Sequence, residues 1–390
     1  MTSPRVCHLG KYYPPSSGGM ESHVQTLARA QVALGLGVRA FCVNHLPGPT
    51  AVERDGEVEV TRFGRAASAA KLDVCPDLVG ALSRVEADLL HLHVPNPTMI
   101  LALLRARTAL PVVVTYHSDV IRQRLLGALF RPLERLAYRR VKAILTTSPG
   151  YPAGSSFLKP YGDRLEVLPH GIDLAPYLEP TAAERAEAAR LRASHPGPLW
   201  VGCGRLVYYK GFLNAIRALP DVPGTLLIVG EGPDRPALEA EARRLGVQDR
   251  LVMCGGVPSL TPYYLAADAF WFPSNARSEA FGLVQVEAMA SGCPVLNTHV
   301  PHSGVDWVSR HEETGLTVPI DDPAALAAAA NRLLAEPGLR RRLAEGARER
   351  ATREFDHRAM AERSLAIYRR ILAEEPSPRP AGRPVLAGGL

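Results

Sequence analysis

The chain has 390 residues, of which 46% are hydrophobic and 22% are charged. At roughly 100–200 residues per domain this length predicts two domains, and the composition excludes a disordered chain. The net charge of +6 is too small for a dedicated nucleic-acid-binding protein. Residues 1–172 hold 20 basic and 13 acidic residues and therefore all of the positive excess, so the two halves should have different partners.

Secretion and membrane-spanning patterns are missing from the sequence. Residues 1–5 lead straight into a strand-like run without a signal-peptide core, and no run of about 18 apolar residues follows. The six cysteines are scattered and form no Cys-x-x-Cys pair, which is typical of reduced thiols in a cytosolic protein. We therefore expect a cytoplasmic protein.

In the first half, short apolar runs alternate with longer amphipathic segments. The runs that we predict to be strands are 5–10, 37–43, 57–63, 87–93, 111–116, 143–147 and 165–169. The helices predicted between them are 21–34, 74–85, 97–107 and 121–140. Alternation of this kind favours a parallel sheet with helices on both faces.

The alternation starts again after a polar, proline-containing segment at 173–198. Here the predicted strands are 199–203, 224–229, 251–254, 269–272, 294–297 and 315–318. The predicted helices are 210–219, 236–245, 259–266, 283–290, 323–334 and 339–350. We expect an α/β protein with two doubly wound, Rossmann-like domains, 1–172 and 173–356, which face each other across a cleft. Helix 357–374 should join the first domain, and 375–390 should be a disordered tail.

Two glycines, Gly18 and Gly19, follow the first predicted strand and open the first predicted helix. Paired glycines let backbone amides approach a phosphate at a helix N-terminus. A plain strand-helix turn is the alternative. The segment lacks the Gly-x-Gly-x-x-Gly fingerprint of dinucleotide-binding dehydrogenases.

A second turn of interest follows the first strand of the second half. Arg205 and Lys210 bracket this turn. Two fixed cations at the carboxyl end of a sheet can neutralise a diphosphate leaving group. Ordinary surface charge is the alternative, but a cation at a helix start opposes the helix dipole, which favours a bound anion.

Two carboxylates eight residues apart mark the predicted helix 283–290. Glu279 precedes the helix and Glu287 lies on it, among apolar neighbours. Between them, the amides of 280–283 are expected to be unpaired donors for phosphate or sugar oxygens. The two carboxylates can hold hydroxyls at two ends of an elongated ligand, although helix-dipole complementarity also accounts for Glu279.

Three histidines are predicted to meet in the cleft. His93 and His117 end neighbouring strands, and His170 lies at the domain junction. A single histidine at a strand end is more often structural than catalytic, but the convergence of three favours a functional role.

These segments, in this order, resemble the retaining, nucleotide-sugar-dependent glycosyltransferases of group 1, family 4, which have the two-Rossmann GT-B architecture. The segments that carry the resemblance are Gly18-Gly19-x-Glu21, Pro169-x-Gly171-x-Asp173, Gly204-Arg205-Leu206 with Lys210-Gly211, Gly230-Glu231-Gly232-Pro233 and Glu279-x7-Glu287. Residues 9–15 and 116–123 are similar to those of a mannosyltransferase-like subgroup of bacterial surface-polysaccharide assembly.

The resemblance implies an acceptor domain at 1–172, a donor domain at 173–356 and a role for each candidate residue. Arg205 and Lys210 would bind the diphosphate, Glu287 would hold the ribose hydroxyls, and His117 would lie beside the donor sugar. The other donor-binding residues would be Gly18, Gly19, Glu279, Ala280, Phe281, Gly282 and Leu283. The catalytic set would be Glu279, His117, Arg205 and Lys210. No metal or other cofactor is expected, and the nucleotide-diphosphate sugar is a co-substrate.

Two departures from the family pattern leave the donor sugar open. His170 stands where the family often has Asn, and residues 300–305 replace a commoner Gly-x-x-Glu turn. We expect retaining transfer of a hexose, with GDP-mannose favoured, to a saccharide or lipid-linked saccharide. Transfer of glucose or N-acetylglucosamine from a UDP-sugar is the alternative. A two-Rossmann sugar-nucleotide epimerase and a non-catalytic sugar-binding protein are further alternatives.

The predicted helix 121–140 is both basic and apolar. Its arginines are Arg122, Arg124, Arg131, Arg135, Arg139 and Arg140. One interpretation is a helix packed on its own sheet with a solvated basic face. The other is contact with an anionic membrane surface, which would place the protein peripherally on the inner face of the membrane and would suit a lipid-linked acceptor.

Overall fold

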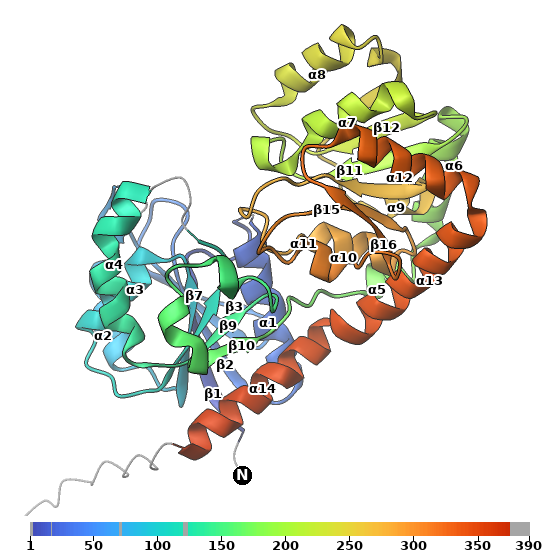
Figure 1. Ribbon diagram of the computed structural model, residues 1–390. Coiled ribbons are helices and arrows are strands. Elements are labelled where there is room, and N and C mark those ends of the chain that lie inside the picture. Colours follow the sequence, from blue (N-terminus) through green and yellow to red (C-terminus); the bar gives the residue numbers. More distant parts are fainter. Residues whose placement is uncertain (1–2, 17, 70–71, 120–123, 375–390) are drawn as a thin grey trace, which may run out of the picture.

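The computed structural model describes residues 3–16, 18–69, 72–119 and 124–374. It is an α/β protein with two large sheets, one in each half of the chain (Figure 1). Most of the predicted elements are confirmed to within two or three residues. The predicted tail 375–390 lies outside the described residues.

The N-terminal sheet has eight strands in the order β10-β9-β8-β7-β1-β2-β4-β3. Its strands are β1 (Arg5–Leu9), β2 (Gly37–Val43), β3 (Ala51–Asp55), β4 (Val58–Phe63), β7 (Leu89–Val94), β8 (Val112–Tyr116), β9 (Val141–Thr146) and β10 (Leu165–Val167). All neighbours pair in parallel except β3 and β4. The helices of this half are α1 (Gly19–Ala33), α2 (Pro76–Ser83), α3 (Pro97–Arg105) and α4 (Arg124–Tyr138).

Three strands of this half were not predicted from the sequence. β3 is an edge strand whose first four residues are exposed, so it lacks the apolar run that marks a buried strand. β5 (Ala67–Ala69) and β6 (Leu72–Val74) form a short separate hairpin. The helix predicted at 121–140 is α4, and residues 121–123 lie outside the described residues.

The C-terminal sheet is wholly parallel, with the strand order β13-β12-β11-β14-β15-β16. Its strands are β11 (Leu199–Cys203), β12 (Thr225–Val229), β13 (Leu251–Gly255), β14 (Ala269–Phe272), β15 (Val295–His299) and β16 (Gly315–Pro319). The helices are α5 (Ala175–Leu178), α6 (Ala182–Ser194), α7 (Phe212–Ala218), α8 (Arg235–Arg244), α9 (Thr261–Ala266), α10 (Leu283–Ala290), α11 (Val305–Val308), α12 (Pro323–Ala335) and α13 (Pro337–Glu354).

The segment expected to be a polar boundary, 173–198, is largely helical. A capping box starts α6, because Thr181 accepts from the Glu184 amide while the Glu184 carboxylate accepts from the Thr181 amide. α6 packs against α9, and α5 packs against α10, so the segment belongs to the C-terminal sheet's domain.

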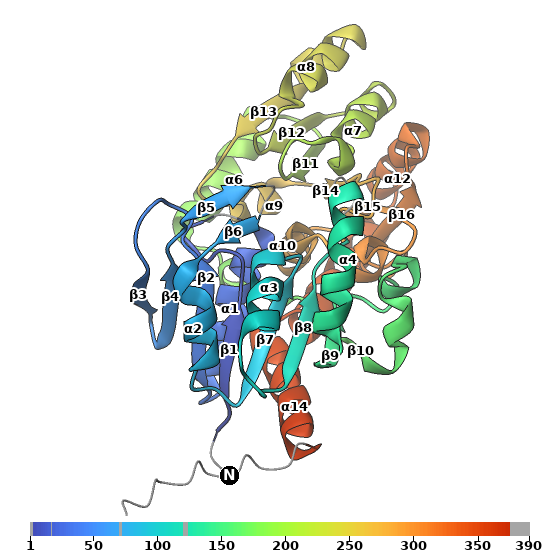
Figure 2. The ribbon, with the colours of Figure 1, turned by 90° about the vertical axis from the view of Figure 1, so that its left-hand side faces the viewer.

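The last helix, α14 (His357–Glu374), returns to the N-terminal domain (Figures 1 and 2). It packs along α1, and its buried residues Met360, Tyr368 and Ile371 share a core with Val24 and Leu27 of α1. The chain therefore passes between the domains twice, and the two passes meet at a bridge between Ile172 and Asp356.

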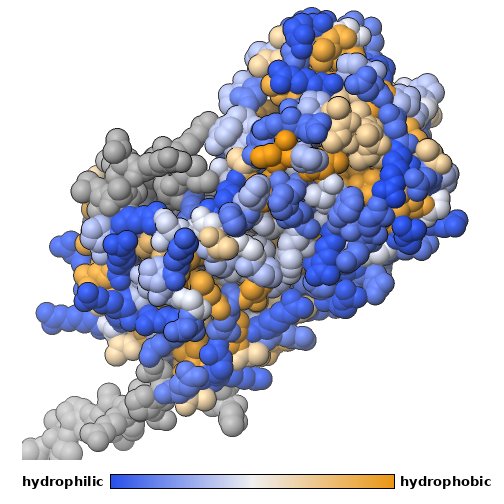
Figure 3. Space-filling view, in the orientation of Figure 1, coloured by the Kyte–Doolittle hydropathy of each residue, from blue (hydrophilic) through white to orange (hydrophobic). Residues whose placement is uncertain are grey.

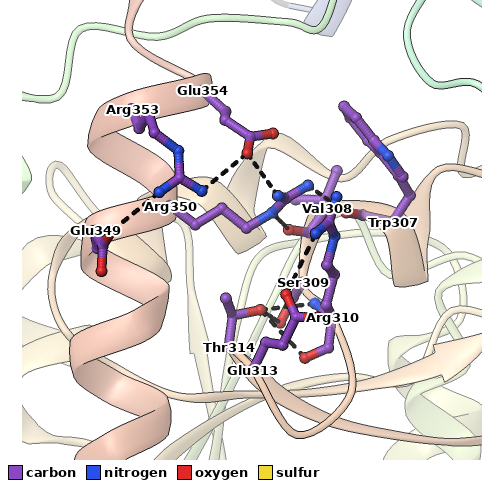
Figure 4. Close-up of polar contacts among 10 residues, drawn as sticks. All are labelled: Trp307, Val308, Ser309, Arg310, Glu313, Thr314, Glu349, Arg350, Arg353 and Glu354. Carbon is purple, nitrogen blue, oxygen red and sulfur yellow. Dashed lines mark hydrogen bonds and ion pairs between the residues drawn. The ribbon is translucent and has the colours of Figure 1, made fainter.

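A buried arginine holds the C-terminal end of α11 (Figure 4). Arg350 on α13 is 3% exposed and donates to the backbone carbonyls of Trp307 and Val308 at 2.8 and 3.0 Å. Its charge is balanced by Glu354 at 2.8 Å, and its guanidinium lies 5.3 Å from the Trp307 ring. These contacts hold α11 against α13.

Among the described residues, no helix is long and apolar enough to cross a membrane. The face of the molecule in Figure 3 is mainly hydrophilic, with apolar side chains in separate patches. Leu133 and Leu136 of α4 are large apolar side chains that are exposed, at 39% and 45%.

Candidate functional site

The turn after β11 brings Lys210 to a carboxylate. Gly204 has φ +144°, and a Cβ there would approach the Lys210 side chain to 3.1 Å, so glycine leaves room for the lysine. Lys210 Nζ lies 2.5 Å from Glu279 Oε2, and each side chain is only 12% exposed. Burial opposes the charge on Lys210, but the Glu279 carboxylate outweighs it and raises the pKa of Lys210. Lysine is therefore a fixed cation at the carboxyl end of the sheet.

Arg205 lies on the same turn but is exposed, and it does not join this ion pair. In the described ranges, no hydrogen bond or ion pair engages its guanidinium. The two predicted cations thus differ. Lys210 is held in place by its partner, whereas Arg205 is available to an anion that enters from solvent.

The loop from Ala280 to Leu283 presents backbone donors. Gly282 has φ +80° and lies at the N-cap of α10, where a Cβ would approach the Phe272 ring to 2.6 Å. Within the part of the chain that the structure describes, no group accepts a hydrogen bond from the amides of residues 280–283. Such amides at a helix start suit a phosphate or sugar oxygen.

Two buried amides hold this loop. Gln285 Nε2 donates to the carbonyl oxygens of Phe281 and Val305, at 3.0 and 3.2 Å. Asn297 Nδ2 donates to Gln285 Oε1 at 3.0 Å and also to the carbonyl oxygens of Val305 and Ser309. The loop before α10 and the start of α11 are therefore fixed to each other and to β15.

Glu287 lies on α10, eight residues after Glu279, between two tyrosines. The Tyr264 hydroxyl donates to its Oε2 at 3.0 Å, and the Tyr177 hydroxyl also bonds to it. Burial raises the pKa of Glu287, and the two hydroxyls and Lys210 oppose that rise. The carboxylate keeps acceptor capacity for a pair of vicinal hydroxyls.

The predicted glycine pair opens α1. Gly18 is the N-cap of α1 with an extended backbone, and a Cβ there would approach Glu21 Oε2 to 2.1 Å. A Cβ on Gly19 would have no atom within 4 Å, so the space beside this first helical residue is open. The geometry suits close approach of a ligand to the backbone.

The structure brings the three predicted histidines together. His117 Nε2 lies 3.2 Å from His93 Nδ1, and the His117 ring stacks on His170 with centroids 5.2 Å apart. His170 also lies edge-on to Phe281 of the loop before α10, at 5.1 Å between ring centroids. Burial lowers the pKa of His170 to about 4 and that of His117 well below its usual range, so both rings are neutral at pH 7.

Three further histidines, not identified from the sequence, complete the cluster. His8 pairs in register with His91, and His23 bonds to His170 with 2.8 Å between their Nδ1 atoms. The spacing His91-x-His93 was the available signal, because alternate residues of a strand face the same side. The register between β1 and β7 could not be predicted from the sequence.

These imidazoles are the groups that could hold a metal ion. Two sets have ligand atoms within 4.8 Å of one another, namely His8 with His91 and His93, and His23 with His93 and His117. Both ring nitrogens of His8, His91 and His93 already have hydrogen-bond partners. These three rings are thus satisfied by hydrogen bonds, whereas His23 Nε2, in the second set, is buried without a partner among the described residues.

An ion pair across the two domains was also missed. Arg277 Nη1 lies 2.9 Å from Asp119 Oδ2, and its guanidinium donates to the carbonyl oxygens of Gly154, Tyr151 and His302. It also lies over the Tyr151 ring, 4.4 Å from the centroid. Arg277 follows β14 and Asp119 follows β8, so the contact joins the carboxyl ends of the two sheets.

Two family patterns match the sequence. Residues 185–350 match the Glycosyl transferases group 1, and residues 18–171 match the Glycosyl transferase 4-like domain. The chain is 33% identical over 333 residues to D-rhamnosyltransferase WbpZ of Pseudomonas aeruginosa, covering 82% of this chain and 84% of that protein. It is 28% identical over 378 residues to O-antigen chain mannosyltransferase C of Escherichia coli, covering 94% and 99%.

Solved structures give the same answer for the fold. Sucrose-phosphate synthase of Thermosynechococcus elongatus superposes with a TM-score of 0.79 at 25% identity, covering 95% of this chain and all of that one. HepE (Alr3699) of Anabaena, in complex with UDP, superposes with a TM-score of 0.74 at 20% identity, covering 94% and 100%. With its two matched domains and two facing parallel sheets, the chain belongs to the group 1 glycosyltransferases and has the GT-B architecture.

Proposed function

We propose that the protein transfers a hexose from a nucleotide-diphosphate sugar to a saccharide or lipid-linked saccharide, with retention at the anomeric carbon and without a metal ion. The observation that carries the proposal is the Lys210–Glu279 pair beside the unpaired amides of 280–283. A cation, a carboxylate and free backbone donors, brought together from two loops, suit a diphosphate joined to a sugar. Glu287 supplies the acceptor that the ribose needs.

In the proposed reaction, the bond between the anomeric carbon and the diphosphate oxygen breaks, and the electron pair leaves with the nucleoside diphosphate. Lys210 and Arg205 stabilise the charge that develops there. The acceptor hydroxyl attacks from the same face, and its proton passes to the departing phosphate oxygen. Closure of the cleft would exclude water and limit hydrolysis of the donor.

We favour mannose from GDP-mannose, with use in surface-polysaccharide synthesis. Support comes from the relatives named O-antigen chain mannosyltransferase C and D-rhamnosyltransferase WbpZ. A UDP-sugar is the second candidate, since HepE, a structural neighbour, was solved with UDP-glucose. A thermal-shift comparison of GDP, UDP and ADP tests the choice. A selective shift with GDP supports the first candidate, and a selective shift with UDP supports the second.

We further propose that the protein acts in the cytoplasm and touches an anionic membrane through α4. Leu133 and Leu136 are exposed on this helix, next to the exposed Arg135. Apolar side chains with adjacent cations suit the boundary between headgroups and acyl chains. Co-sedimentation with phosphatidylglycerol vesicles at low and moderate salt tests this, with Leu133→Ser/Leu136→Ser as the variant. No binding by the unmodified protein at low salt would contradict it.

A further inference from the structure

A continuous chain of side-chain hydrogen bonds runs from α14 to His117. It starts at Ser364 and Tyr368, both of which contact Gln31 of α1. Gln31 Oε1 lies 2.8 Å from His8 Nε2, and His8 Nδ1 lies 3.0 Å from His93 Nε2. The 3.2 Å contact between His93 Nδ1 and His117 Nε2 completes it.

Gln31 determines which atom donates and which accepts in each of these hydrogen bonds. The Ser364 hydroxyl donates to the backbone carbonyl of Ala361 at 2.7 Å, so its proton is used and its oxygen can only accept. Gln31 therefore turns its amide nitrogen to Ser364, at 2.9 Å, and to the Tyr368 hydroxyl, at 3.1 Å. Both N–H bonds of the amide are then used, and Oε1, which faces His8, can only accept.

A neutral imidazole has one protonated and one unprotonated ring nitrogen, so a ring that donates from one nitrogen accepts at the other. The donor and acceptor roles set at Gln31 are therefore repeated at each histidine. His8 must carry its proton on Nε2 to donate to Gln31, which leaves its Nδ1 as an acceptor. His93 must then carry its proton on Nε2, which leaves its own Nδ1 as an acceptor. His117 donates to that atom from Nε2 and keeps an unprotonated Nδ1.

We propose that Gln31, His8 and His93 are positioning residues that hold His117 as the Nε2-protonated tautomer, with Nδ1 as an acceptor for a hydroxyl of the donor sugar. The inference rests on the proposed function, in which His117 lies beside that sugar. Among the described residues, no group bonds to His117 Nδ1, so this acceptor is open to a ligand.

The surroundings keep the chain neutral. His8, His91 and His93 are fully buried, and burial lowers the pKa of His8 to about 4 and those of the other two well below the usual range. A doubly protonated ring would end the relay, because it has two donors and no acceptor. Burial thus keeps each histidine neutral, so that it can donate from one ring nitrogen and accept at the other.

A side branch supplies a matched control. The Tyr368 hydroxyl accepts from Gln31 and donates to His91 Nδ1 at 2.6 Å, and His91 Nε2 then donates to the Thr115 hydroxyl at 2.7 Å. Thr115 is 1% exposed and so as buried as His8 and His93. It does not belong to the series of hydrogen bonds that joins Gln31 to His117. Thr115→Val should disturb the core without changing the tautomer of His117.

The test is nitrogen-15 NMR of the full-length, metal-free protein with labelled histidine, with the His117 signals assigned by their loss in His117→Asn. We expect Nε2 protonated and Nδ1 unprotonated in the unmodified protein and in Thr115→Val. In Gln31→Met, which cannot accept from His8, a second population with the proton on Nδ1 should appear. With donor sugar, kcat of Gln31→Met should fall at least about tenfold while KM for the donor changes less.

Two results would overturn the proposal. One is a His117 proton on Nδ1 in the unmodified protein. The other is a Gln31→Met spectrum with His117 unchanged. The NMR experiment requires no substrate and therefore tests the tautomer of His117 independently of the transferase activity. The proposed function itself is tested by an assay for released nucleoside diphosphate.

Discussion

Lys210 and Glu279 form an ion pair, 2.5 Å from Nζ to Oε2, at the carboxyl end of the C-terminal sheet. The two residues come from different loops, after β11 and after β14. In the absence of a ligand each neutralises the other in a site that is nearly closed to water. Under the proposed function, an entering diphosphate would compete with the carboxylate for Lys210, and the adjoining sugar would contact Glu279.

Replacement of Lys210 should greatly reduce the rate of sugar transfer. We expect Lys210→Ala to lower kcat/KM by at least about 100-fold, because the leaving diphosphate loses a buried cation. The assay is release of nucleoside diphosphate from a nucleotide sugar. Arg244→Ala is the matched control, since it removes an exposed cation of the same domain that pairs with Glu241. Near-normal turnover of Lys210→Ala would contradict the role.

The carboxylate of Glu287 should act through binding. We expect Glu287→Gln to raise the Kd of the nucleoside diphosphate about tenfold and to change kcat less, because the ribose is remote from the bond that breaks. Tyr264→Phe should have a smaller effect of the same kind. Calorimetry with ribo- and 2′,3′-dideoxy nucleotides is the measurement. The dideoxy penalty should shrink in Glu287→Gln, and an equal penalty in both proteins would exclude contact with the ribose.

Arg277 should control how the domains close. Arg277→Ala removes the ion pair to Asp119 and the hydrogen bonds to the carbonyl oxygens of Gly154 and Tyr151 in the N-terminal domain, which we expect to cost about 1–3 kcal/mol of interdomain contact. The ligand-free variant should have a larger radius of gyration by small-angle X-ray scattering. Arg310→Ala, which removes an exposed pair with Glu313, should not. Equal radii for all three proteins would show that the pair does not hold the cleft.

Stability should fall in mild acid because of the buried histidines. The pKa of His170 is lowered by burial from 6.5 to about 4, so between these values the unfolded chain binds more protons than the folded one. Unfolding free energy should therefore drop by about 1.4 kcal/mol for this histidine between pH 7.5 and 5.5. Urea unfolding of His170→Asn should show a correspondingly smaller drop. His299→Asn, at an exposed site, is the control, and an unchanged pH dependence in His170→Asn would refute the assignment.

The sequence predicted local structure and the donor turns well. The strands 199–203 and 269–272 and the helix 283–290 have the predicted bounds, since each is a compact apolar run between clear turn signals. Contacts between distant segments were harder to predict. Arg277 and Asp119 are 158 positions apart, and nothing local to either residue indicates its partner.

The histidine cluster shows the same limit. His93, His117 and His170 were expected to converge because strand ends meet at one edge of a sheet. His8, His23 and Gln31 entered only through strand register and the packing of α1 and α14 on the sheet. Periodicity places a residue on a face, but it does not say which residue of a neighbouring element lies opposite.

The most direct test of the account is binding of GDP, UDP and ADP to the unmodified protein, Lys210→Ala and Arg244→Ala by calorimetry in metal-free buffer. We predict that at least one nucleotide binds the unmodified protein and Arg244→Ala equally, and binds Lys210→Ala at least about tenfold more weakly. Binding of no nucleotide, or equal binding to all three proteins, would contradict a nucleotide-sugar site at Lys210 and Glu279.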